Sequence, residues 1–172
     1  MAGKEAGQKT RKEGGSMFGK ESAQRSRAGK KLKVLFFSAG DAVRSQMAEG
    51  FFRSISGEEL EGACTAVKPE SNPLAVEVMQ EVGIDVSADK PKPIKEMFKE
   101  HFTCVITLAD PNKERDPVWP FTRNLYHWKL TDPLEGARST EEKKEALRHV
   151  RDEIRENVKE FASSVAPKLR GK

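Results

Sequence analysis

One short segment of the chain combines residue types that bind oxyanions. An apolar run ends at Ser38, six positions before Arg44, and Ser45 opens a stretch with helical character. Backbone N–H groups at the start of a helix converge on an anion, and an arginine adds a planar fork that fits phosphate-like oxygens. The segment therefore predicts an oxyanion-binding loop. Its members are Ser38, Ala39, Gly40, Asp41, Ala42, Val43, Arg44 and Ser45.

The reactivity of this loop depends on the side chain at position 38. A cysteine at a helix N-terminus can have its pKa lowered to roughly 3.5–7.5, which makes it a thiolate nucleophile. A serine hydroxyl is a far weaker acid and needs an adjacent base. Asp41 could act as that base, whereas His101, His127 and His149 are not placed near the loop by the sequence. The residue types therefore favour anion binding over nucleophilic turnover.

The chain around this loop alternates between strand-like and helix-like stretches. Leu32–Phe37 is an apolar run that predicts a buried strand, and Arg44–Ile55 carries apolar residues at helical spacing. Strands that alternate with helices favour an α/β fold with a parallel sheet, in which ligand sites lie at the carboxyl ends of the strands. The other expected strands are Cys64–Val67, Thr103–Leu108 and Asn124–Leu130, and the other expected helices run from Pro73 to Gly83, over Ile94–Phe98 and from Thr140 to Val165.

Charge and composition divide the 172 residues into two parts. Residues 1–31 hold nine Lys or Arg against three Glu, whereas the whole chain has a net charge of only +4. That segment is rich in Gly, Ser and Lys, which predicts a disordered basic tail in front of one domain over residues 32–172. No run approaches the roughly 18 apolar residues of a membrane span, and the N-terminus lacks the apolar core of a signal peptide. We therefore expect a cytoplasmic protein with no membrane partner.

The two cysteines, Cys64 and Cys104, have no spacing typical of a metal site or a disulfide framework. Both lie in apolar, strand-like surroundings, which indicates a buried structural role in a reducing compartment. We expect no cofactor and no resident metal site.

Several segments of the chain resemble those of a known family. The segment Ser38-Ala-Gly-Asp-Ala-Val-Arg-Ser-Gln-Met-Ala-Glu-Gly50 resembles the signature loop of low-molecular-weight protein tyrosine phosphatases. It is especially similar to that of their relatives, the thioredoxin-coupled arsenate reductases. The resemblance implies a flavodoxin-like three-layer sandwich with a four-stranded parallel sheet. It continues through Asn72-Pro73, Val82-Gly-Ile-Asp-Val86, Val105-Ile-Thr-Leu108, His127-Trp128 and Asp132-Pro133.

Departures from the family's pattern bear directly on function. The family's nucleophilic cysteine is replaced by Ser38, and the two relay cysteines of the reductases fall on Ala109 and Asp116. The resemblance places Asp132 at the general-acid position. The chain is thus identified as a divergent member without the catalytic cysteines, whose family-equivalent catalytic positions are Ser38, Arg44 and Asp132. A thioredoxin partner is not expected, because no thiol relay remains.

Three functions stay open at this stage. The first is binding of phosphate, arsenate or a phosphomonoester by a phosphatase-like pseudoenzyme. The second is an enzyme of the phosphatase or arsenate-reductase type that uses Ser38 in place of cysteine, with Asp132 as general acid. The third is an interaction module with a vestigial site, in which the basic tail recruits nucleic acid or an acidic partner.

Three placements also stay open. Asp41 either braces the loop by accepting backbone N–H groups or points inward and repels an anion, and it tolerates the left-handed backbone that such loops require. By resemblance, Asp41 and Glu49 are candidates for a potassium site. Four aromatic residues have three possible places: the mouth of the site, the core or a partner surface. They are Trp119, Phe121, Tyr126 and Trp128.

Overall fold

The computed structural model describes residues 31–120, 122–137 and 139–170. The predicted tail, residues 1–31, therefore lies outside the described residues except for Lys31, and Phe121 lies outside them as well. None of the helices in the described part of the chain is long and apolar enough to span a lipid bilayer.

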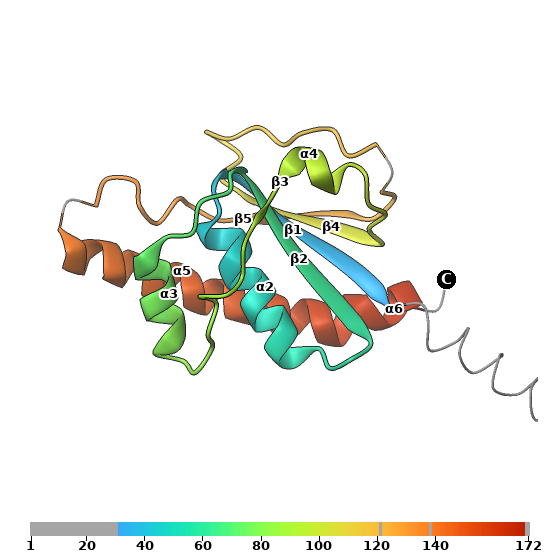
Figure 1. The fold of residues 1–172 in the computed structure, drawn as a ribbon, viewed down its shortest axis with the longest axis horizontal. Helices are drawn as coiled ribbons and strands as arrows, with labels where there is room; N and C mark the ends of the chain where they lie inside the picture. Colours follow the sequence, from blue (N-terminus) through green and yellow to red (C-terminus); the bar gives the residue numbers. More distant parts are fainter. Residues whose placement is uncertain (1–30, 121, 138, 171–172) are drawn as a thin grey trace, which may run out of the picture. The chain divides into compact units, whose positions relative to one another are not determined.

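A parallel sheet forms the centre of the fold, in the order β3-β2-β1-β4-β5 (Figure 1). The α/β parallel architecture is confirmed, but the sheet has five strands rather than the predicted four. The additional strand, β3, has only two residues, which pair with Thr65 and Ala66 of β2. Such a short strand contains no apolar run from which the sequence could predict it. The strands are β1 (Leu32–Asp41), β2 (Leu60–Lys68), β3 (Lys92–Pro93), β4 (Cys104–Ala109) and β5 (Leu125–Lys129).

Helices cover the sheet at the places that the sequence predicts, with local shifts at their ends. Asn72 accepts a hydrogen bond from the backbone N–H of Leu74, which starts one helix at Pro73. Ser139 and Glu142 form a reciprocal capping box that starts the long C-terminal helix. The sequence predicted that this helix ends at Val165. In the structure, Phe161–Val165 form a wider π-helical turn, η1, and the short helix α6 follows it. The helices are α2 (Val43–Ile55), α3 (Pro73–Gln80), α4 (Ile94–Met97), α5 (Thr140–Glu160), η1 (Phe161–Val165) and α6 (Ala166–Arg170).

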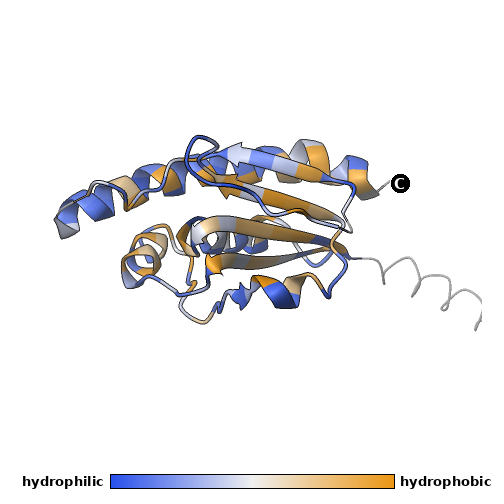
Figure 2. Ribbon diagram, turned by 90° about the horizontal axis from the view of Figure 1, so that it is seen from above, coloured by the Kyte–Doolittle hydropathy of each residue, from blue (hydrophilic) through white to orange (hydrophobic). Residues whose placement is uncertain are grey.

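The main core lies between one face of the sheet and the helices α2, α3 and α5. Val34 and Phe36 of β1 point into it, while Leu35 joins a smaller cluster with Met97 of α4 on the opposite face. Figure 2 shows apolar colour concentrated on the strands, whereas α5 alternates between hydrophilic and apolar residues. Burial of the apolar stripe of α5 against the core therefore holds this long, highly charged helix in place.

The central strand carries the predicted loop to the carboxyl edge of the sheet. Residues 34–37 of β1 are fully buried, because β2 and β4 flank the strand and side chains cover both of its faces. Only Ala42 separates β1 from α2. The loop is thus held between the most buried strand and the helix that packs on it, which restricts its movement.

The two cysteines lie on the strands that flank β1. Cys64 pairs in register with Phe36, and Cys104 pairs with Val34. Two strand spacings, about 9–10 Å, and an offset of two residues along β1 separate them. The spacing alone exceeds the Cα–Cα reach of a disulfide, about 7 Å. Burial raises the pKa of Cys104 to about 12. Burial also raises the pKa of Cys64, and the neighbouring Glu49 carboxylate raises it further.

We therefore predict that mild oxidation of the folded protein forms no bridge between Cys64 and Cys104. Their separation across β1 and their raised pKa values keep both thiols protonated and apart. Intact-mass analysis after treatment with a disulfide reagent, with a urea-unfolded sample as the control, checks this. A reversible Cys64–Cys104 bridge in the folded sample would contradict the arrangement described here.

Candidate functional site

Ser38 stands where β1 reaches the carboxyl edge of the sheet, and it is fully buried. Its Oγ accepts a hydrogen bond of 2.8 Å from the backbone N–H of Ser45 in the first turn of α2. The Ser45 hydroxyl donates to the Ala42 carbonyl instead of to Ser38. The serine side chain therefore ties the end of the strand to the start of the helix.

Asp41 takes the bracing position, one of the two that the sequence left open. Its Oδ1 accepts a hydrogen bond of 3.1 Å from the backbone N–H of Val43. Burial raises the pKa of the Asp41 carboxyl, the Val43 N–H partly offsets this, and the negative charge of Asp132 raises it further. The left-handed backbone expected at Asp41 is absent, since no non-glycine residue in the described chain has positive φ. Asp41 instead pairs with Lys68 of β2, which keeps its backbone extended.

Arg44 is fully buried, and its guanidinium is hydrogen-bonded to a carboxylate from a distant part of the chain. Nη1 donates to Oε2 of Glu114 at 2.8 Å, and Nη2 donates to Oε1 at 2.6 Å, which is the bidentate geometry of a strong ion pair. Nη1 also donates to the Leu130 carbonyl at 3.1 Å. The Glu114 side chain keeps 16% of its surface exposed. Arg44 is therefore held by a carboxylate at the rim of the site.

Glu114 is held on a single turn that follows β4. Its backbone N–H donates to the Asp110 carbonyl at 2.9 Å, and the N–H of Asp110 donates back to Oε2 of Glu114 at 2.7 Å. Burial alone would raise the pKa of Glu114, but the bonds from Arg44 and Asp110 outweigh it and lower the pKa below the ordinary value. A Cβ added at Gly40 would lie 3.3 Å from Oε1, so the carboxylate rests against the loop. Sequence reasoning missed this residue.

Asp132 lies close enough to the loop to act on it electrostatically. Its charge is one of the causes that raise the pKa of Asp41. Its Oδ1 accepts a hydrogen bond of 2.9 Å from the N–H of Leu134, so the carboxylate also shapes the turn of its own segment. The structure thus brings Asp132 within electrostatic range of Asp41 in the loop.

Of the two positions at which the resemblance would place relay cysteines, Ala109 directly follows Leu108, which pairs with Ser38, and Asp116 lies in the segment after β4. Ala109 ends β4. Asp116 contacts Nδ1 of His127 at 2.8 Å and accepts a hydrogen bond of 3.0 Å from the hydroxyl of Thr107. These contacts engage Nδ1 of His127 with Asp116 and Thr107. Within the described residues, the Ser38 hydroxyl has only the Ser45 amide as a partner and no basic side chain.

The suggested potassium pair is not assembled. Asp41 interacts with Arg44, Asp132 and Glu114, whereas Glu49 shares a hydrogen bond with Cys64 and lies near Asp89. Seven residues, Ala42 and the first two turns of α2, separate Asp41 from Glu49, and the interacting groups of the two carboxylates do not overlap. The described part of the chain holds no group of three or more His, Cys, Asp or Glu residues arranged for a metal ion.

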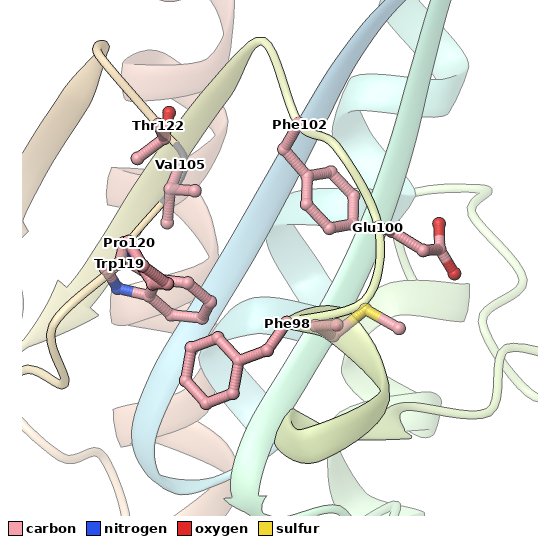
Figure 3. A pocket seen from close by; sticks show the side chains of 8 residues that line it. Phe98, Glu100, Phe102, Val105, Trp119, Pro120 and Thr122 are labelled. Carbon is pink, nitrogen blue, oxygen red and sulfur yellow. The ribbon is translucent and has the colours of Figure 1, made fainter.

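The aromatic residues do not gather at the mouth of the site. Tyr126 and Trp128 pack against Phe161 in the main core, whereas Trp119 packs against Phe37 and Phe98 on the opposite face of the sheet. Figure 3 shows Trp119 and Phe98 lining a pocket with Phe102. That pocket has a volume of about 20 Å³, room for one water molecule. It is too small for a substrate.

Known proteins resemble this chain over nearly all of its described length. The sequence pattern of the family described as "Low molecular weight phosphotyrosine protein phosphatase" matches residues 33–170. An arsenate reductase of Halalkalibacterium halodurans is 33% identical over 135 residues, which are 78% of this chain and 97% of that protein.

Solved structures show the same fold. An arsenate reductase in a phosphate-binding state superposes with a TM-score of 0.65 at 27% identity, covering 78% of this chain and 98% of the other. A low-molecular-weight protein tyrosine phosphatase from T. tengcongensis superposes with a TM-score of 0.61 at 23% identity, covering 78% and 100%.

We predict that Glu114→Gln lowers the free energy of unfolding by about 2 kcal/mol at neutral pH, because it removes the charge that pairs with a buried guanidinium. A carboxyl whose pKa is lower in the folded state stabilises that state above its unfolded pKa, ordinarily 4.5, and loses this contribution as the pH falls through the folded value. The difference between wild type and variant should therefore shrink below about pH 4.5. Urea unfolding at several pH values measures it.

Glu135→Gln is the matched control, since its carboxylate forms an exposed ion pair with Lys113. That exchange should change stability by less than about 1 kcal/mol at any pH. A stability loss in Glu114→Gln that stays constant through the acid range would show that the charge of Glu114 is not what stabilises the site.

Proposed function

Because the chain belongs to the low molecular weight phosphotyrosine protein phosphatase family, we propose that it binds a phosphate-like oxyanion at Arg44 without cysteine chemistry. The ligand class comprises phosphate, arsenate and phosphomonoesters. The proposed binding segment is residues 38–45, with Arg44 as the main clamp and Ser38 and Ser45 as the residues that keep it in place.

The bidentate pair between Arg44 and Glu114 carries this proposal. A carboxylate and a phosphate-like anion both present two oxygens on one edge, and a guanidinium binds either through the same pair of N–H groups. The fork of Arg44 is therefore already oriented for a two-oxygen anion. Its contact with the Leu130 carbonyl fixes that orientation from behind. One of the similar structures was solved in a phosphate-binding state, which supports the same ligand class here.

The residues around the site favour binding over turnover. Ser38 has no base within hydrogen-bonding distance in the described structure, so its hydroxyl is not activated as a nucleophile. Reduction of arsenate needs thiols to supply two electrons. The chain's only cysteines, Cys64 and Cys104, are buried on separate strands and carry raised pKa values. We therefore propose a pseudoenzyme in which the family's electrostatic clamp is kept and its thiol chemistry is not.

Calorimetric titration with phosphate and arsenate tests the proposal. Wild type should bind both saturably, and Arg44→Lys should bind at least about tenfold more weakly, because lysine keeps the charge but loses one charge-assisted hydrogen bond. Absence of binding by both wild type and Glu114→Gln, in which the carboxylate charge opposite Arg44 is removed, would leave the fold as an interaction module.

Ser38→Ala separates binding from hydrolysis. In our proposal the variant keeps most of its affinity for phosphate, since the Ser38 hydroxyl only supports the start of α2. Wild type should show no turnover of an aryl phosphate above background. Turnover that disappears in Ser38→Ala would instead establish a serine hydrolase, with Asp132 as the candidate general acid.

The affinity for a phosphomonoester should rise as the pH falls from about 8 to about 5.5. The dianion of the ester takes up one proton near pH 6, and the resulting monoanion is repelled less by the carboxylates of Asp41, Asp132 and Glu114. Asp41 adds to the effect, because its raised pKa means that it takes up a proton at a higher pH than an ordinary aspartate. Asp41→Asn should flatten the profile, whereas affinity that falls in acid would show that the site selects the dianion.

A further inference from the structure

We propose that Glu114 is a built-in competitor of the oxyanion site. Its carboxylate occupies Arg44, and an external anion binds only when the 110–116 segment withdraws it. This inference rests on the proposed function, since it concerns the regulation of the same site.

Glu114 occupies the edge of the Arg44 guanidinium that is formed by its two terminal nitrogens. Glu114 takes both terminal nitrogens, and the second hydrogen-bonding direction of Nη1 is used by the Leu130 carbonyl. The carboxylate also rests against the loop at Gly40, where a phosphate-like ligand of this segment would lie. Arg44 itself has no exposed surface. Arg44 Nε has no hydrogen-bond partner, but it is buried like the rest of the side chain, so an incoming anion reaches the guanidinium only by displacing the carboxylate that covers it.

The segment that delivers Glu114 is attached in a way that permits withdrawal. Asp110 holds the turn through the backbone N–H groups of Lys113 and Glu114 and, by its own side chain, through that of Asn112. Beyond the turn, Lys113 forms an exposed ion pair with Glu135, and Asp116 at the far end of the segment contacts Thr107 and His127. Few buried apolar contacts hold such a turn, so it opens at lower cost than the strands beside it.

Electrostatics favour two states of the site, one with the Glu114 carboxylate on Arg44 and one with an external anion there. With Glu114 in place, Arg44 is neutralised, and Asp41 and Asp132 leave the entrance negative, which disfavours a second anion. With Glu114 withdrawn and no ligand bound, a buried guanidinium would lack a counter-charge, which is costly. The site is thus either closed by its own carboxylate or filled by an oxyanion, and ligand binding releases the 110–116 segment.

Titration of Glu114→Gln with phosphate tests the competitor directly. Removing the charge weakens the internal occupant, so the variant should bind phosphate at least about tenfold more tightly than wild type, the gain expected when a competing closed state is depopulated. Glu77→Gln removes an exposed carboxylate of α3 that pairs with Lys144 of α5 and does not contact the 110–116 segment, and its affinity should stay within about twofold of wild type. Equal or weaker binding by Glu114→Gln would overturn the proposal.

Hydrogen exchange of the wild-type protein gives a second readout. The Asp110 amide donates to Oε2 of Glu114, so saturating phosphate should speed its exchange while the amides of β1 stay protected. An Asp110 amide that stays protected while wild type binds phosphate through Arg44 would overturn the competitor and leave the proposed function standing. If neither wild type nor Glu114→Gln binds millimolar phosphate, the proposed function itself fails, and the competitor fails with it.

Discussion

The buried guanidinium of Arg44 is the constraint on which the rest of the site depends. A cation without solvent contact needs an anion at bonding distance, because the cost of removing it from water is otherwise not offset. In this structure the anion comes from Glu114, seventy residues further along the chain. The turn after β4, the extended backbone at Gly40 and the carbonyl of Leu130 all meet at this one side chain. Their positions are therefore linked, and a change at any of them acts on the others.

Local sequence predicted most of the fold because each major element carries its own signal. The apolar run of β1, the Asn72-Pro73 start of α3 and the start of α5 near Thr140 all lie close to their expected positions. The short strand β3 could not be found in this way. Both of its residues, the charged Lys92 and Pro93, are exposed and have no strand-like sequence pattern. Only their pairing with β2 makes them a strand.

The site was predictable only where its contacts are short in sequence. Asp41 reaches the Val43 amide two residues away, and Ser38 reaches Ser45 within one strand–helix connection. Glu114 lies in a run of alternating charges, Lys113-Glu114-Arg115-Asp116, in which nothing distinguishes it from its neighbours. Its role arises from the pairing of β4 with β1, which brings the end of one strand beside the end of the other. Among the aromatic residues, Tyr126 and Trp128 share one face of β5, whereas Trp119 lies in the loop before β5 and packs on the opposite face of the sheet.

The composition of β3 also decides how the sheet ends. Unpaired edges of parallel strands offer rows of N–H and C=O groups on which another polypeptide can add, and repeated addition produces fibrils. Pro93 has no N–H to offer, and Lys92 brings a charge to the same short strand. Where β3 pairs with β2, it therefore ends the sheet. Its composition disfavours the addition of a further strand there, and with it the formation of extended β aggregates.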